Sequence, residues 1–399
     1  MKEPSEEIQI HIKPGQSKVF LAALSVILLL ATSCGIFSAS CMQWNLDMDT
    51  LGSEGTVRYK QCEGVEARVG SLVSEKGIRD TANFIFVEDQ IATKEASEFL
   101  PSVFLPLMKR YKLEPGCEVE ARHLPTVYVE TALIASFSRF SRQIPFPYVL
   151  LSGESDISVP QGIGRAFTDW ILNSPKLIWW YAQNLNTNGE HATKLRHMPI
   201  GLDYHSIEGT KTRIEQEKEL LEITRLSKLL KHRQVKIYSS FHSNLPDAWH
   251  GSDREEAYRG IAKELITHEP SRVSRHDTWQ KQSEYAFVAS PHGRGLDTHR
   301  TWEALMLGCI VVVKTSSLDP LYEGLPVVIV NRWSDVSKDL LDKSVEKFSL
   351  LQDRHKTVDE FVRSLSHLQL KHWRSEISTA QASLTRLSKV ESDTPSLRH

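Results

Sequence analysis

Residues 285–313 read YAFVASPHGRGLDTHRTWEALMLGCIVVV, and this stretch decides the fold class. It begins with the apolar run 285–289 and ends with a second apolar run at 310–313. Between them, residues 298–307 place apolar side chains at helical spacing, and Gly308 stands where such a helix would end. Short apolar runs bounded by Pro, Gly and Ser are typical of buried parallel strands. The stretch therefore predicts a strand, a turn, a helix and a second, parallel strand.

The same alternation extends in both directions. Further apolar runs that predict strands lie at residues 83–87, 126–129, 148–151, 177–180, 235–238 and 327–330. Residues 207–232 and 254–266 predict helices, and the first of these segments is charged with a weak apolar pattern. We take residues 207–232 as the connection between two halves. The predicted fold class is α/β, with two α/β halves facing a cleft.

The N-terminal region carries a long apolar stretch. No charged residue occurs at positions 19–44. Because about 20 apolar residues span a bilayer as a helix, residues 19–40 predict a transmembrane signal-anchor in the lipid bilayer. Lys13 and Lys18 precede the stretch and acidic residues follow it, which predicts a cytoplasmic N-terminus and a lumenal body. A signal peptide cleaved near residues 38–40 is the alternative.

The bulk composition excludes some classes of protein. Apolar residues make up 40% of the chain and charged residues 25%, as in globular proteins. The 48 basic and 50 acidic side chains leave a net charge of −2, which argues against a nucleic-acid partner. Of the five cysteines, Cys62 and Cys117 are candidates for a disulfide if the body is lumenal, and Cys309 is expected in the core.

The loop at residues 290–298 has the composition of a site for an anionic ligand. Gly293 and Gly295 allow a tight turn and a close approach of a ligand to the backbone. The amides and the positive dipole end at the start of the following helix suit a diphosphate. Arg300 falls in the first turn, where its guanidinium can bind phosphate oxygens in a bidentate manner. Glu303 lies on the same helix face and can accept hydrogen bonds from ribose hydroxyls.

This segment resembles the donor site of the exostosin-like glycosyltransferases. Their pattern is Ser-Pro-x-Gly-x-Gly-x-Asp-x-x-Arg-x-Trp-Glu-Ala-Leu-x-x-Gly-Cys-Ile. The strong match covers residues 279–333, with weaker echoes at 150–156, 180–184 and 198–202, and Val311 departs from a common proline. The matching residues are Ser290, Pro291, Gly293, Gly295, Asp297, Arg300, Trp302, Glu303, Ala304, Leu305, Gly308, Cys309 and Ile310.

The resemblance implies an enzyme that moves a sugar from a nucleotide sugar to a hydroxyl of a glycan or glycoprotein acceptor, usually with inversion. It implies the GT-B arrangement of two Rossmann-like domains, no metal and no other cofactor. It also implies a single-pass type II protein of the Golgi or endoplasmic reticulum membrane. The implied donor-binding residues are Ser290, Gly293, Gly295, Asp297, Arg300 and Glu303. Lys314 follows the valine strand and is a further donor-binding candidate, with a solvated loop lysine as the equal alternative.

Domain boundaries follow from these signals together. The expected parts are a cytoplasmic tail (1–18), the signal-anchor (19–40), a stem (41–75), an N-terminal Rossmann-like acceptor domain (76–206), a C-terminal Rossmann-like nucleotide-sugar domain (207–374) and a tail (375–399).

Inverting transfer needs a general base that deprotonates the acceptor hydroxyl. The base is expected in the N-terminal half, after a strand, because ligands of open α/β sheets lie beyond the carboxyl ends of the strands. Asp156 is the first candidate, followed by Glu154 and Asp203, with His205 beside the last. A loop cap or a solvated charge is the alternative for each.

Other interpretations remain open at this level. The chain is alternatively a catalytically silent, membrane-tethered partner of an active transferase that binds a nucleotide sugar or glycan, or a secreted lectin-like protein. The residues 179–181, Trp-Trp-Tyr, suit either sugar stacking or a buried strand end, with at least one tryptophan expected in the core. The histidines lack ligand spacing, so we predict no metal site.

Overall fold

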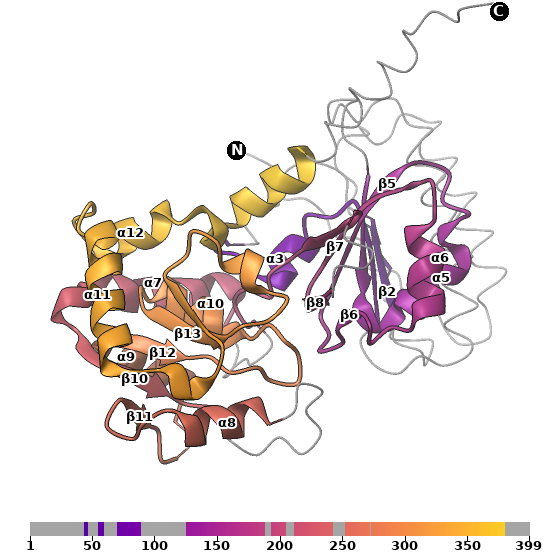
Figure 1. Cartoon of the computed structure of the whole chain (residues 1–399). Helices are drawn as coiled ribbons and strands as arrows, with labels where there is room; N and C mark the ends of the chain where they lie inside the picture. Colours follow the sequence, from indigo (N-terminus) through magenta and orange to yellow (C-terminus); the bar gives the residue numbers. More distant parts are fainter. Residues whose placement is uncertain are drawn as a thin grey trace, which may run out of the picture.

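The computed structural model describes residues 44–46, 55–59, 70–88, 125–187, 193–204, 211–241, 252–271 and 273–379. These residues form two α/β lobes that lie side by side (Figure 1). We call them the N-terminal lobe, built on the seven-stranded sheet, and the C-terminal lobe, built on the five-stranded sheet. The prediction of two α/β halves with parallel sheets is confirmed.

The N-terminal lobe has the strand order β1-β2-β3-β4-β5-β7-β9. Its strands are β1 (Trp44–Leu46), β2 (Gly55–Tyr59), β3 (Phe84–Glu88), β4 (Thr126–Glu130), β5 (Tyr148–Gly153), β7 (Leu177–Ala182) and β9 (Leu195–His197). Strands β1, β2 and β3 pair antiparallel, whereas all pairs from β3 to β9 are parallel. A separate two-stranded sheet joins β6 (Val159–Pro160) to β8 (Leu185–Asn186).

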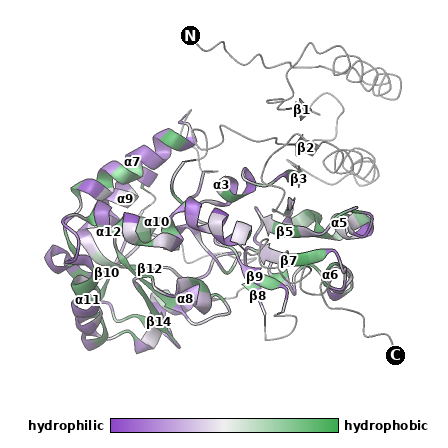
Figure 2. Cartoon of the chain, turned by 90° about the horizontal axis from the view of Figure 1, so that it is seen from above, coloured by the Kyte–Doolittle hydropathy of each residue, from purple (hydrophilic) through white to green (hydrophobic). Residues whose placement is uncertain are grey.

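Two helices cover one face of this first sheet, α5 (Ile134–Ser141) and α6 (Arg165–Leu172). Both show hydrophobic and hydrophilic colours in Figure 2, as expected for helices with one face on a sheet and the other in solvent. In α6, Ile171 is fully buried while Trp170 is 43% exposed. Trp180 of β7 is also fully buried and donates its Nε1 hydrogen bond to Ser152, so the expected core tryptophan is confirmed.

The C-terminal lobe has a parallel sheet with the order β11-β10-β12-β13-β14. Its strands are β10 (Gln234–Ser239), β11 (Ile266–His268), β12 (Tyr285–Ala289), β13 (Ile310–Lys314) and β14 (Val327–Val330). Along the chain this order is second, first, third, fourth, fifth. From β10 the chain adds β11 on one side, and it then crosses back to add β12 on the other side. The gap between β10 and β12 is therefore a switch point, and such a point leaves a crevice beyond the carboxyl ends of the strands.

Helices complete both lobes. They are α3 (Glu75–Arg79), α7 (Arg213–Leu226), α8 (Asp253–Gly260), α9 (Arg275–Glu284), α10 (His299–Met306), α11 (Lys338–Gln352) and α12 (Val358–Ser364). Short 3₁₀ turns lie at η1 (Thr131–Leu133), η2 (Leu230–His232), η3 (Asp319–Tyr322), η4 (Trp333–Asp335) and η5 (Ser366–Leu368), and residues 370–379 are helical.

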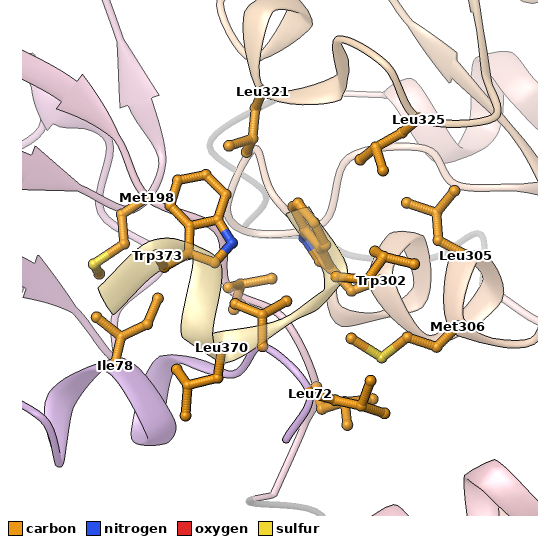
Figure 3. Packing of buried hydrophobic residues seen from close by; sticks show 14 of the residues in the cluster. Leu72, Ile78, Met198, Trp302, Leu305, Met306, Leu321, Leu325, Leu370 and Trp373 are labelled. Atoms are coloured by element: carbon orange, nitrogen blue, oxygen red, sulfur yellow. The ribbon is translucent and has the colours of Figure 1, made fainter. Parts of the chain in front are cut away.

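One hydrophobic cluster belongs to both lobes. It contains Ile78 and Met198 of the N-terminal lobe together with Trp302 and Leu321 of the C-terminal lobe. Figure 3 shows Trp373, from the helix at 370–379, between these two groups of side chains. In Figure 1 this yellow helix reaches from the C-terminal lobe toward the N-terminal lobe. The lobes are therefore joined by a continuous core.

Several details differ from the sequence expectations. The helix expected at 254–266 ends at Gly260, and the edge strand β11 follows it because Leu265 and Ile266 are buried. Strands β1 and β2 fall within the range 41–75 that was expected to be a stem. At the other end the helix at 370–379 crosses position 375, the expected start of the tail, because Trp373 and Ile377 are buried in the shared core.

The predicted signal-anchor at 19–40 lies outside the described residues, as do Cys62, Cys117 and His205. Within the described part of the chain, no helix combines the length and apolar character needed to cross a bilayer.

Candidate functional site

The carboxyl ends of the two sheets meet at the loop 290–298. This loop follows β12, and it contacts Asn184, which follows β7 of the N-terminal lobe. The Asn184 side chain accepts a hydrogen bond from the amide of Asp297 at 2.8 Å and donates one to the carbonyl of Ser155 at 2.8 Å. A second link runs from the Ser317 hydroxyl to the carbonyl of Leu185, also at 2.8 Å. The loop that the sequence singled out thus lies at the junction of the lobes.

Asp297 is a buried link in this junction. Its carboxylate accepts hydrogen bonds from the amide of Ile200 in the N-terminal lobe at 2.8 Å and from Trp302 Nε1 at 2.9 and 3.0 Å. It also accepts one from the amide of Thr298. Burial raises the pKa of Asp297 to about 6, although the hydrogen bonds oppose this. The structure therefore gives Asp297 a structural role, and a contact with the donor stays a prediction.

Both glycines of the loop have close neighbours. A Cβ atom at Gly295 would lie 2.9 Å from Nδ2 of Asn184, and one at Gly293 would lie 3.1 Å from Nη2 of Arg254. The amide of Gly293 donates a hydrogen bond to the carbonyl of Gly295 at 3.0 Å and closes the turn. Gly295 is thus required where the loop passes the other lobe, whereas a side chain at Gly293 would need only a small movement of the Arg254 guanidinium.

Arg300 has an unused hydrogen-bond donor. The residue lies in the first turn of α10, and its Nη1 atom is buried with no hydrogen-bond partner among the described residues. Burial and, to a smaller extent, the positive charge of Arg254 lower the pKa of Arg300 to about 9, while Glu303 opposes the shift. Removing part of a cation from water without a hydrogen-bond partner, as at this Nη1 atom, is costly unless an anion joins it.

Arg254 is the second cation at this place. It is the second residue of α8, and its Nε donates a hydrogen bond to the carbonyl of His292 at 3.3 Å. Burial lowers the pKa of Arg254, and the negative charge of Asp156 opposes the shift. Asp156 is exposed and follows β5 of the other lobe. Helices α8 and α10 start beyond β10 and β12, so the two arginines flank the switch point.

Glu303 is held by two residues of α9. Its Oε1 accepts a hydrogen bond from Arg275 Nη2 at 2.7 Å, and its Oε2 accepts one from Trp279 Nε1 at 3.1 Å. Arg275 also donates to the side chain of Gln216 at 2.7 Å and to the backbone carbonyl of Asp203. The carboxylate is therefore fixed in one orientation, and its ribose contact stays a prediction.

The remaining donor candidates are bound within the protein. The Ser290 hydroxyl lies 2.8 Å from the hydroxyls of Thr298 and Thr301. Lys314 Nζ lies 2.7 Å from carboxylate oxygens of both Asp253 and Glu256. Burial alone would lower the pKa of Lys314, but the hydrogen bonds to these carboxylates raise it. These contacts of Ser290 and Lys314 leave their role in donor binding as a prediction.

The three base candidates have different surroundings. Glu154 has a positive φ of 54° and accepts a hydrogen bond from Arg79 Nη1 at 2.6 Å. Asp203 contributes its backbone carbonyl to Arg275. Asp156 is close enough to Arg254 for their charges to interact. Asp156 is thus the candidate that lies near Arg254.

Sequence reasoning did not single out Arg254, Arg275 or Asn184 as site residues. Only Asn184 had a signal, since it lies in the echo at 180–184 of the family pattern. Arg254 and Arg275 lie in charged helices, and the sequence pattern of such a helix does not distinguish an arginine that binds a ligand from one that faces solvent. Across the described ranges, no group of three or more His, Cys, Asp and Glu side chains is placed to hold a metal ion.

Comparisons with known proteins add little to this geometry. No family model matches the chain, and no curated protein matches it. Among solved structures, one that is similar is a UDP-forming alpha,alpha-trehalose-phosphate synthase from Burkholderia xenovorans. The two chains share 11% identity with a TM-score of 0.31, over 74% of this chain and 79% of that one. At such a TM-score the likeness carries no argument about function.

Proposed function

We propose that the chain is a glycosyltransferase that binds the diphosphate of a nucleotide sugar at Arg300 and transfers the sugar to a hydroxyl of a glycan or glycoprotein. One observation carries the proposal: the buried Nη1 of Arg300 has no hydrogen-bond partner among the described residues, and Arg254 adds a second positive charge beside it. A diphosphate would supply acceptor oxygens for the Nη1 of Arg300 and negative charge beside both guanidinium groups.

The same groups suit the chemistry of sugar transfer. As the bond to the sugar breaks, negative charge grows on the leaving diphosphate, and fixed cations at that position stabilise the transition state. Arg300 and Arg254 are such cations, held on two helices of the C-terminal lobe. Asp156 enters from the N-terminal lobe and is the proposed general base that deprotonates the acceptor hydroxyl.

Membership of the exostosin-like family, inversion, and catalysis without a metal or other cofactor belong to this proposal. They are supported by the pattern in residues 290–310. The membrane anchor at 19–40 and a place in the Golgi or endoplasmic reticulum membrane are proposed as well, on the apolar stretch alone.

Calorimetry on the purified chain tests the proposal. We expect UDP, GDP or another nucleoside diphosphate to bind, and Arg300→Ala to weaken that binding by about 1.5–3 kcal/mol, as for a charge-assisted hydrogen bond. The matched control is Arg259→Ala on α8, because the Arg259 side chain is 75% exposed and pairs with Glu255 one turn away. Equal affinity of wild type and Arg300→Ala would exclude the site. Hydrolysis or transfer of a bound nucleotide sugar then separates an enzyme from a silent binding partner.

A further inference from the structure

A row of aromatic rings starts beside Arg300. The Arg300 guanidinium carbon lies 5.6 Å from the ring centre of Phe241. Phe241 packs edge-on against His268 at 6.2 Å between ring centres, and His268 packs against Tyr258 at 4.5 Å. We call Phe241, His268 and Tyr258 the aromatic row. It links the proposed phosphate site to the surface of the C-terminal lobe.

The three residues of the row come from different elements that meet at one place. Phe241 follows β10, His268 is the last residue of β11, and Tyr258 lies on α8. Strand β11 is the edge strand next to β10, so the row runs from the switch point toward the edge of the sheet. Helix α8 and strand β11 are neighbours at the bottom of the C-terminal lobe in Figure 1.

Helix α8 contributes to both ends of this arrangement. Arg254 and Tyr258 are four residues apart, so they share one face of the helix. Arg254 lowers the pKa of Arg300 at the proposed phosphate end, and the Tyr258 ring packs against His268 at an interplanar angle of 40° at the outer end. One helix face therefore presents a cation and then an aromatic ring, in the order in which a nucleotide presents its phosphates and its base.

The row changes from buried to exposed along its length. Phe241 is 9% exposed, whereas Tyr258 is 54% exposed. His268 is fixed between them, because its Nδ1 lies 3.1 Å from the Ser239 hydroxyl. An exposed tyrosine ring held against an ordered imidazole offers a flat surface on which another ring can stack.

We propose that the aromatic row binds the nucleobase of the nucleotide, with Tyr258 as its main stacking residue. This inference rests on the proposed function, since it assigns the base end of the ligand whose diphosphate lies at Arg300. Stacking on an aromatic side chain accepts any base, because every base has a π face. The row therefore explains binding of the nucleoside and leaves the choice among bases to other groups.

Binding of two probes to the purified full-length chain tests the assignment. Calorimetry compares a nucleoside diphosphate, UDP or GDP, with inorganic pyrophosphate, which has no base. The variants are Tyr258→Ala and Tyr258→Phe, and the matched control is Trp170→Ala, which removes an exposed aromatic ring from α6 of the other lobe. Because Tyr258 is exposed, its replacement leaves the core intact.

We expect Tyr258→Ala to weaken nucleoside diphosphate binding by about 5- to 100-fold and to leave pyrophosphate binding unchanged. Tyr258→Phe keeps the ring and should restore wild-type affinity. If Tyr258→Ala leaves the nucleoside diphosphate unaffected while both probes bind, the base site is refuted and the proposed function stands. An equal loss for both probes also refutes it. If neither probe binds wild type, the proposed function itself fails.

Discussion

The amide of Ile200 in the N-terminal lobe donates a hydrogen bond to the buried carboxylate of Asp297 in the C-terminal lobe, at 2.8 Å. Because burial raises the pKa of Asp297 from 3.8 to about 6, the folded protein holds this proton more tightly than the unfolded chain. The contribution of Asp297 to stability is therefore greatest below pH 3.8 and falls as the pH rises to about 6.

The loss amounts to at most about 3 kcal/mol in the free energy of unfolding, since each pKa unit corresponds to about 1.4 kcal/mol. Denaturant titrations of wild type and Asp297→Asn at a series of pH values measure it. The difference in unfolding free energy between the two proteins should shrink as the pH rises through this window, because asparagine does not titrate. A constant difference would contradict the raised pKa.

The charge of Arg300 should be visible in the pH dependence of ligand binding. With a pKa of about 9 in the free protein, Arg300 loses its proton at a pH where other arginines keep theirs. The affinity for UDP should therefore fall by about tenfold between pH 8 and pH 10. Calorimetry at several pH values checks this. Arg300→Ala should bind more weakly throughout and lack the alkaline fall; an identical fall in that variant would assign it to another group.

Glu303 should affect only ligands that contain a ribose. Glu303→Gln keeps the size of the side chain and one oxygen for Arg275 or Trp279. We expect it to weaken UDP binding by about 1–2 kcal/mol while pyrophosphate binding stays within error. Titrations with both ligands measure the two affinities. Equal losses would mean that Glu303 acts through the phosphate end, by releasing Arg275.

Asp156 should affect turnover and not donor binding. If it is the general base, Asp156→Asn should lower the transfer rate by about 10²- to 10⁴-fold, the usual contribution of such a group. A transfer assay with a nucleotide-sugar panel and calorimetry of the same variant provide the two measurements. A variant with normal turnover would remove Asp156 from the mechanism, and Glu154 and Asp203 would be examined next.

The contact of Gly295 with Asn184 should respond to pairs of substitutions. Gly295→Ala places a Cβ atom 2.9 Å from the Asn184 amide and should destabilise the protein by about 1–3 kcal/mol, as overpacking does. Asn184→Gly should tolerate the added methyl group better, and it suits the positive φ of 53° at this position. Thermal unfolding of the single and double variants gives the coupling energy. Additive effects would rule out a direct clash.

Much of the C-terminal lobe was predictable because its signals are local. The runs at 285–289 and 310–313 became β12 and β13, and the expected helix at 298–307 is α10 at His299–Met306. Gly308 ends that helix with a φ of +74°, which glycine adopts without strain. Apolar runs, helical spacing and a terminal glycine all lie within a few residues of one another, so sequence reasoning could find them.

Contacts between distant segments had no such signal. Strands β1 and β2 lie in a polar region; β1 pairs with β2 and β2 pairs with β3, both antiparallel, which no local pattern revealed. The same holds for Arg254 and Arg300, whose charges interact although they are far apart in the sequence, because α8 and α10 both start beside the switch point of the C-terminal sheet. The loop at 290–298 was predicted to bind a ligand, but the hydrogen bond that links its Asp297 to Ile200 of the other lobe was not predicted.

The shared cluster around Trp302 and Trp373 limits how this chain can be divided or recombined by engineering. A fragment that ends between the lobes, or one that lacks the helix at 370–379, would expose a large apolar surface to water. Such a fragment should aggregate instead of staying soluble. Neither lobe is therefore expected to fold as an independent domain. Replacing one lobe by that of another two-lobed α/β protein would require the apolar residues on both sides of the shared cluster to be redesigned together.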